Sequence, residues 1–227
     1  MNTGVWHRGQ ILLAACLLLA GCDKDSEDKE RAIRPEGTWT ITEAATIEGQ
    51  PYQGTVEIAR QGEAFHVQWE TEAGSYPGIG LVRGSHLFVG WGNETAGVVI
   101  YQIGDDGTLE GQWTNFVANG IGTEQAQRNG EGSLEGTYQL AGKNADGTEY
   151  TGSLDIRRTG EVFHLAWGGN AGTETGVGIQ IDKLLVVGYG VGGSGVIDWA
   201  ITDKATATGR WTTEGAERIA VENLQRQ

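Results

Sequence analysis

The sequence is poor in cysteine, proline, histidine and positive charge. Its 227 residues include 2 Cys, 3 Pro and 4 His, and only 16 Lys and Arg accompany 30 Asp and Glu. Two cysteines are too few for a disulfide framework or a cysteine-rich metal site. The acidic excess argues against nucleic acid as a partner, because nucleic acid is bound through a basic surface. We therefore predict no structural metal and no nucleic-acid partner.

The sequence also lacks an apolar run of the ~20 residues that a membrane-spanning helix needs. The apolar run Ile11–Ala20 is much shorter, and it lies between Arg8 and Gly21. A basic segment, a short apolar segment and small residues before a cleavage site form the layout of an export signal. Leu19-Ala-Gly-Cys22 resembles the lipobox of bacterial lipoproteins, in which the signal is removed before the cysteine and the cysteine is lipidated.

This resemblance implies a signal peptide at residues 1–21 and a lipid, palmitate or a related acyl chain, on Cys22. Residues 22–35 then form a flexible charged tether, because the stretch DKDSEDKERAIRP has almost nothing apolar to bury. We expect a cell-envelope protein that is anchored to a membrane through its lipid, with the folded part outside the cytoplasm. The choice between inner and outer membrane stays open. The alternative is an ordinary cleaved signal in which Cys22 is incidental.

An internal repeat organises the remaining sequence. Arg60–Trp69 returns as Arg158–Trp167, 98 positions later, and the similarity continues through the rest of both copies. Only the openings differ, by one residue, and we place this difference in the first hairpin loop. The repeat predicts two homologous units, residues 36–128 and 135–227, joined by a linker at 129–134.

Abundant glycine and short alternating apolar segments indicate an all-β fold. Glycine contributes 38 residues, and Phe65, Val67 and Trp69 alternate with neighbours of the opposite face, as in a half-buried strand. Similar segments recur between turn signals such as Asp105-Asp-Gly107. We count eight short strands in each unit. Each unit is predicted to be an antiparallel meander that closes into a small up-and-down β-barrel of its own; a β-sandwich is the alternative.

Gly37-Thr-Trp39 at the start of the first unit and Arg128 at its end resemble the calycin signature of lipocalins, fatty-acid-binding proteins and avidins. In that signature a basic side chain of the last strand packs on the tryptophan of the first. The second unit has Tyr138 and Arg226 at these places, so its tyrosine departs from the pattern. The resemblance implies small β-barrels. It implies no particular ligand, because the binding residues of avidins and the loop motifs of lipocalins do not map onto this chain.

The stretch Gly188-Tyr-Gly-Val-Gly-Gly193 matches the glycine pattern of dinucleotide-binding sites. Such a site needs a helix after the glycines, which presents its N-terminus to the pyrophosphate. Here residues 196–201 follow, and they alternate as a strand. We therefore interpret the glycines as a hairpin loop and predict no nucleotide or other cofactor.

His66 and His164 are repeated beside the same aromatic pair, which makes them candidate binding residues. Each unit has one such histidine, without a second His or Cys in ligand spacing, so we predict no metal at them. The chain has no G-x-S-x-G elbow, and nothing in the sequence singles out a pair of carboxylates in one cleft. We therefore predict that the protein is not an enzyme.

The tryptophans of the apolar phase are predicted to fill the barrels. Gly111 and Gly209, which alternate with them, are expected to leave space at a barrel mouth. Binding is expected in loops at one barrel end where the copies diverge, such as residues 93–96 and 191–194. Trp91 and Tyr189 stand just before these loops and are the nearest aromatic candidates for contact with a ligand or partner.

These observations predict a membrane-anchored, non-catalytic binding or protein-interaction module of the cell envelope. Its partner is an unknown envelope protein or a small ligand. The alternative is a carrier of a small hydrophobic ligand of calycin type, which requires an apolar cavity in the fold.

Overall fold

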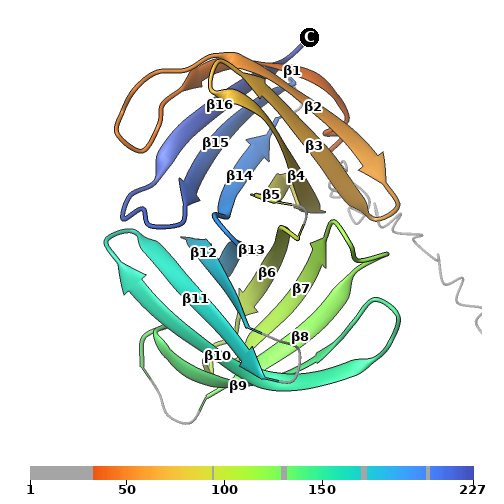
Figure 1. The fold of residues 1–227 in the computed structure, drawn as a ribbon, viewed down its shortest axis with the longest axis vertical. Helices are drawn as coiled ribbons and strands as arrows, with labels where there is room; N and C mark the ends of the chain where they lie inside the picture. Colours follow the sequence, from red (N-terminus) through yellow and green to blue (C-terminus); the bar gives the residue numbers. More distant parts are fainter. Residues whose placement is uncertain (1–32, 94, 129–131, 170–172, 203–204) are drawn as a thin grey trace, which may run out of the picture. The chain divides into compact units, whose positions relative to one another are not determined.

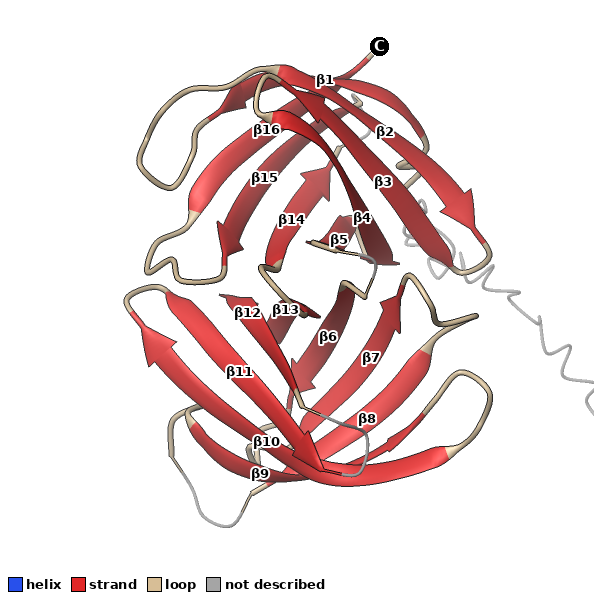
Figure 2. Ribbon diagram, in the orientation of Figure 1, coloured by secondary structure: helices blue, strands red, loops and turns tan. Residues whose placement is uncertain are grey.

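The computed structural model describes residues 33–93, 95–128, 132–169, 173–202 and 205–227, which form antiparallel strands without a helix (Figures 1 and 2). The strands close into two barrels of eight, as the repeat predicts. Their bounds are β1 Gly37–Ala44, β2 Gly54–Gln61, β3 Ala64–Thr71, β4 Gly74–Arg83, β5 His86–Trp91, β6 Gly97–Ile103, β7 Leu109–Asn115, β8 Gly122–Gln127, β9 Gly136–Lys143, β10 Glu149–Thr159, β11 Val162–Gly169, β12 Glu174–Ile181, β13 Leu184–Gly190, β14 Gly195–Ile201, β15 Thr206–Thr213 and β16 Ala220–Arg226.

Each barrel is built from both repeats. Barrel A contains β1 to β5 of the first repeat and β14 to β16 of the second, whereas barrel B contains β6 to β8 of the first and β9 to β13 of the second. The prediction that residues 36–128 and 135–227 each close a barrel of their own is therefore wrong. The two repeats have exchanged their last three strands.

The exchange leaves the pairing of equivalent residues unchanged, because homologous strands have the same pattern of side chains and hydrogen-bonding groups. In barrel A, Leu87 of β5 pairs with Trp199 of β14. In barrel B the equivalent residues, Leu185 of β13 and Tyr101 of β6, pair in the same register. A strand pattern that fits one partner thus fits the other copy equally well.

The connections between β5 and β6 and between β13 and β14 pass from one barrel to the other. The prediction of a hairpin loop at residues 188–193 is therefore wrong, and so is the prediction that residues 93–96 and 191–194 lie at a free barrel end. They lie side by side, where the amide of Asn93 donates to the carbonyl of Val191. At the crossing, a Cβ on Gly90 would lie 1.9 Å from the carbonyl oxygen of Gly97, and one on Gly188 would lie equally close to that of Gly195.

The glycines of 188–193 are thus explained by this crossing. Gly192 and Gly193 also have φ of 82° and 98°, in the region that favours glycine. Strand β14, and not a helix, follows them, as the alternation at residues 196–201 predicts.

Three clusters of buried apolar side chains form the core of the two barrels and the contact between them. One fills barrel A around Trp39, Trp69 and Trp199, and a second fills barrel B around Tyr101 and Tyr138. A third lies between the barrels, where strands of both contribute Ala64, Ile79, Leu81, Phe88, Val98, Ile100, Ile179, Val186 and Val196. The outward faces of β4, β5, β6, β12, β13 and β14 are buried here, which explains why these strands are apolar on both faces.

The arginine of the predicted signature packs on the aromatic ring of the other repeat. The guanidinium of Arg226 lies 4.7 Å from the ring centroid of Trp39, and that of Arg128 lies 5.6 Å from Tyr138. The predicted pairing of Trp39 with Arg128 is wrong, because Arg128 follows β8 and β8 belongs to barrel B. The one-residue difference between the copies is also not in a loop: it is a register shift in β1 between Ile41 and Glu43.

The predicted tether reaches barrel A at its last three residues. Ile33 packs against the core of barrel A, the carbonyl of Arg34 accepts from Arg226, and that of Pro35 accepts from the indole of Trp39 at 2.8 Å. The predicted signal peptide, Cys22 and the rest of the tether lie outside the described residues, as does part of the predicted linker, 129–131.

In the described part of the chain, no helix is long and apolar enough to cross a membrane.

Candidate ligand sites at the mouths of the barrels

A row of residues across four strand pairs of barrel B carries a buried glutamate at its centre. In register, Tyr101 of β6 faces Gly111 of β7, which faces Glu124 of β8. Glu124 faces Gly142 of β9, which faces Tyr150 of β10. The glycines let the two tyrosine rings lie flat across the sheet toward Glu124: a Cβ on Gly111 would lie 2.8 Å from Tyr101, and one on Gly142 would lie 2.2 Å from Tyr150.

The carboxyl group of Glu124 is held by three donors of barrel B. The hydroxyl of Tyr101 donates to it, the hydroxyl of Tyr150 donates at 2.9 Å and the indole of Trp167 donates at 3.4 Å. Glu124 is only 8% exposed. Burial raises the pKa of this carboxyl, although the three hydrogen bonds act in the opposite direction.

Barrel A repeats this arrangement 98 positions away. Glu222 of β16 is 1% exposed, and its carboxyl accepts from the hydroxyl of Tyr52 at 2.5 Å and from the indole of Trp69 at 3.0 Å. Burial raises the pKa of Glu222. At the position of Tyr101 stands Trp199, which donates to the backbone carbonyl of Glu222 instead of the carboxyl. Glu222 therefore has one side-chain donor fewer than Glu124.

Gly111 and Gly209 do not leave space at a barrel mouth, in contrast to the prediction. The ring of Tyr101 lies against Gly111, and a Cβ on Gly209 would lie 2.5 Å from Trp199. Gly111 instead lines a separate hollow with residues of β7 to β10 such as Gln112 and Lys143, and neither glycine lines the cavity in the mouth of its barrel.

A cavity of about 300 Å³ opens in the mouth of barrel A. Its wall is mostly aromatic, and Glu222 contributes to its lining. The lining residues are Thr46, Tyr52, Trp69, Thr71, Ala73, Tyr76, Trp91, Ile197, Trp211, Thr213 and Glu222.

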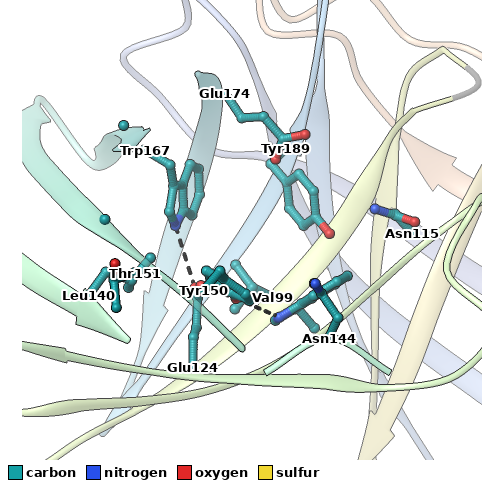
Figure 3. Close-up of a pocket in the computed structure, with 13 residues that line it drawn as sticks. Val99, Asn115, Glu124, Leu140, Asn144, Tyr150, Thr151, Trp167, Glu174 and Tyr189 are labelled. Atoms are coloured by element: carbon teal, nitrogen blue, oxygen red, sulfur yellow. Dashed lines mark hydrogen bonds between the residues drawn. The ribbon is translucent and has the colours of Figure 1, made fainter. Parts of the chain in front are cut away.

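The equivalent cavity in barrel B measures about 160 Å³ and is more polar. Figure 3 shows Trp167, Tyr189 and Asn144 around it. Glu174 takes the place of Tyr76, and Asn115 and Asn144 take the places of two threonines. Burial and the neighbouring Glu124 raise the pKa of Glu174. Each cavity needs both repeats, since its glutamate comes from one and the tryptophan that donates to it comes from the other.

Of the four predicted binding residues of the folded part, the structure brings two to these cavities. Trp91 lines the cavity of barrel A and Tyr189 that of barrel B. Tyr189 is buried, and its hydroxyl donates to the carbonyl of Thr114 at 3.2 Å.

The two histidines lie away from both cavities. The ring of His66 makes an edge contact with the ring of Phe116, with 5.5 Å between the two ring centroids. His66 lines a separate hollow, together with Glu63 and Asn119. His164 is half-buried on β11, opposite Val177. Among the described residues, no group of three or more His, Cys, Asp or Glu side chains is placed to hold a metal ion.

The two buried glutamates and their tyrosines are not among the residues predicted from the sequence. A signal for them was present, because Glu124 shares the inward phase of β8 with Gly122 and Ala126. Glu222 stands at the same place in the second copy. A charged residue repeated on an inward phase marks a position worth inspection.

Protein-family models and curated proteins both give no match to this chain.

Proposed function

We propose that this protein is a lipid-anchored, non-catalytic binding protein of the cell envelope that holds a small ligand in the mouth of each barrel. The observation that carries the proposal is the duplicated buried glutamate under an open aromatic wall. Of the two functions expected from the sequence, the cavities favour the ligand carrier over the protein-interaction module.

The energetic cost of the glutamates supports this proposal. A buried carboxyl loses hydration, and replacing buried ionisable groups by apolar residues often leaves stability unchanged or improves it. A barrel that served only as a scaffold would gain nothing from Glu124 and Glu222. Both copies nevertheless keep the carboxyl and two side-chain donors to it.

A buried hydrogen-bond donor without a partner in barrel A also supports a ligand in this cavity. The indole nitrogen of Trp211 is buried and has no hydrogen-bond partner among the described residues, although Trp211 lines the cavity. Its equivalent, Trp113, donates to Tyr150 at 3.0 Å. A buried donor without a partner costs about 1–3 kcal/mol. A ligand with an acceptor atom in this cavity would remove that cost.

The anchor is part of the proposal. The lipobox-like segment before Cys22 supports lipidation at this residue, and the membrane then binds the protein through its acyl chains. The folded barrels stand outside the cytoplasm at the end of the charged tether, where small ligands of the envelope reach them.

The proposal is tested with the soluble chain that begins at residue 33 and a chemically broad panel of small molecules. Tryptophan emission should shift saturably on binding, because Trp69, Trp91 and Trp211 lie at the cavity of barrel A. Replacing Trp91 by Leu should weaken binding, whereas Trp39→Phe, at a residue that does not line the cavity, should not. A panel without any saturable response would contradict the proposal.

A further inference from the structure

The cavity of barrel A combines one buried carboxyl with an almost continuous aromatic wall. The ring of Tyr76 stacks on Trp69 at 5.1 Å, and Trp91 lies 6.1 Å from Trp69 and 5.7 Å from Trp211. Glu222 is the only acidic residue that lines this cavity among the described residues. A ligand at this site meets ring faces and edges on its flanks and a carboxyl group at its inner end.

The chemistry of this wall selects one class of ligand. An anion would be placed beside a carboxylate in a poorly hydrated site, and a neutral hydrocarbon would leave the carboxyl without a matching group. A cation is attracted by the negative faces of the rings and forms an ion pair with the carboxylate. Resting on the proposed function, we infer that the mouth of barrel A binds an organic monocation, an ammonium group with apolar substituents.

The volume fits this class. A cavity of about 300 Å³ lies at the lower end of the range for small-molecule sites, and it therefore suits a compact amine rather than a long acyl chain. The wall is too apolar for a fully hydrated inorganic ion, whose water shell it would have to replace with ring carbons.

Barrel B provides a natural comparison within the same chain. It has the same buried glutamate, but its cavity is smaller, Glu174 replaces Tyr76 and Tyr189 replaces Trp91. The aromatic wall is thereby interrupted, and Glu124 is already held by a third donor, Tyr101. We therefore assign the binding site of the organic monocation to barrel A.

Binding of a cation is coupled to a proton on Glu222. The titratable groups that face this carboxyl are Tyr52, at the start of the segment that leads into β2, and Tyr76 of β4. Burial raises the pKa of both tyrosines, so they stay neutral, and the carboxyl is the group among these three that changes its charge. Since burial also raises the pKa of Glu222, protons compete with the cation at low pH. Affinity should rise with pH until the free protein has lost this proton.

The experiment compares benzyltrimethylammonium with neopentylbenzene, its neutral isostere, by tryptophan fluorescence and calorimetry on the chain from residue 33. The cation should bind about tenfold more tightly than the isostere, with an affinity that increases with pH. Glu222→Gln keeps the side-chain shape and an acceptor, and it should reduce the preference and remove the pH dependence. Glu124→Gln tests the cavity of barrel B in the same way. The control variant Glu110→Gln, at an exposed residue of β7, should leave the preference and the pH dependence unchanged.

Each outcome decides between the two proposals. Equal affinity of the wild-type protein for both compounds overturns the cation inference and leaves the small-ligand function intact. Loss of the preference in Glu124→Gln but not in Glu222→Gln overturns the assignment to barrel A. Binding of neither compound overturns the inference, and the proposed function falls as well only if the broad panel also gives no response. If Glu222→Gln does not fold, the pH dependence of the wild-type protein decides.

Discussion

The indole nitrogen of Trp69 donates to Glu222 at 3.0 Å, although the two residues are 153 positions apart. Its equivalent in the other barrel, Trp167 with Glu124, joins the second repeat back to the first at 3.4 Å. Both bonds connect one repeat to the other. The exchange of three strands therefore determines the candidate sites as well as the barrels.

The first prediction concerns this exchange. A protease site inserted in the linker, near Gly130, should be cut without separating the halves, because each barrel retains strands of both halves. The nicked protein should elute as one particle of full mass in size-exclusion chromatography with light scattering. It should separate into two fragments only in denaturant. Halves that separate under native conditions, each with a cooperative melt, would show that every repeat closes a barrel alone.

The second prediction concerns the crossing between the barrels. Gly90→Ala should lower the free energy of unfolding by at least ~3 kcal/mol, because the new Cβ would lie 1.9 Å from the rigid carbonyl of Gly97. Gly168→Ala is the matched control, since the closest atom to its Cβ would be the Ser153 hydroxyl at 3.3 Å. Urea denaturation measures both variants. Equal stability of the two would mean that β5 and β6 do not cross at this glycine.

The third prediction is a pH dependence of stability. Burial raises the pKa of Glu124 and Glu222 in the folded protein. The contribution of such a group to stability is fully present below its unfolded pKa, about 4.3, and it is lost as the pH rises through the folded pKa. The wild-type protein should therefore lose stability relative to Glu222→Gln as the pH rises above about 4.

Urea denaturation at several pH values measures this difference. Glu110→Gln, at an exposed residue of β7, is the control, and its curve should run parallel to that of the wild-type protein. A Glu222→Gln curve that is also parallel would show that the carboxyl titrates as if it were in water.

The fourth prediction concerns the anchor. Cys22→Ser should abolish labelling by radioactive palmitate completely, because serine has no thiol to receive the lipid. The variant should remain unprocessed or appear as a soluble species in cell fractionation. Cys16→Ser, within the predicted signal, is the control and should still be labelled. Persistent labelling of Cys22→Ser would contradict the lipoprotein interpretation.

Part of the candidate site followed from the repeat, and part did not. Trp91 and Tyr189, the equivalent aromatic residues beside the divergent loops, both line a cavity. The divergent loops themselves connect the two barrels, so they do not form the binding loops that the sequence predicts at a free barrel end. The alternation of β8 marks Glu124 as an inward-facing residue, but it does not show which side chains surround the carboxyl group. Only the closed sheet places Tyr101 and Tyr150 on either side of it.

The local structure follows from the sequence alone: the alternation of side chains, the turns and the sixteen short strands of the described residues. These features depend on residues close together in the chain, and period-2 patterns encode them directly. The choice of which repeat supplies the last three strands of each barrel depends on contacts between residues far apart in the chain. Strands β6 and β14 are homologous, so both fit the edge of β5 in the same register. The choice depends on the short connections at 92–96 and 191–194, and on the apolar cluster between the barrels that forms when those connections cross.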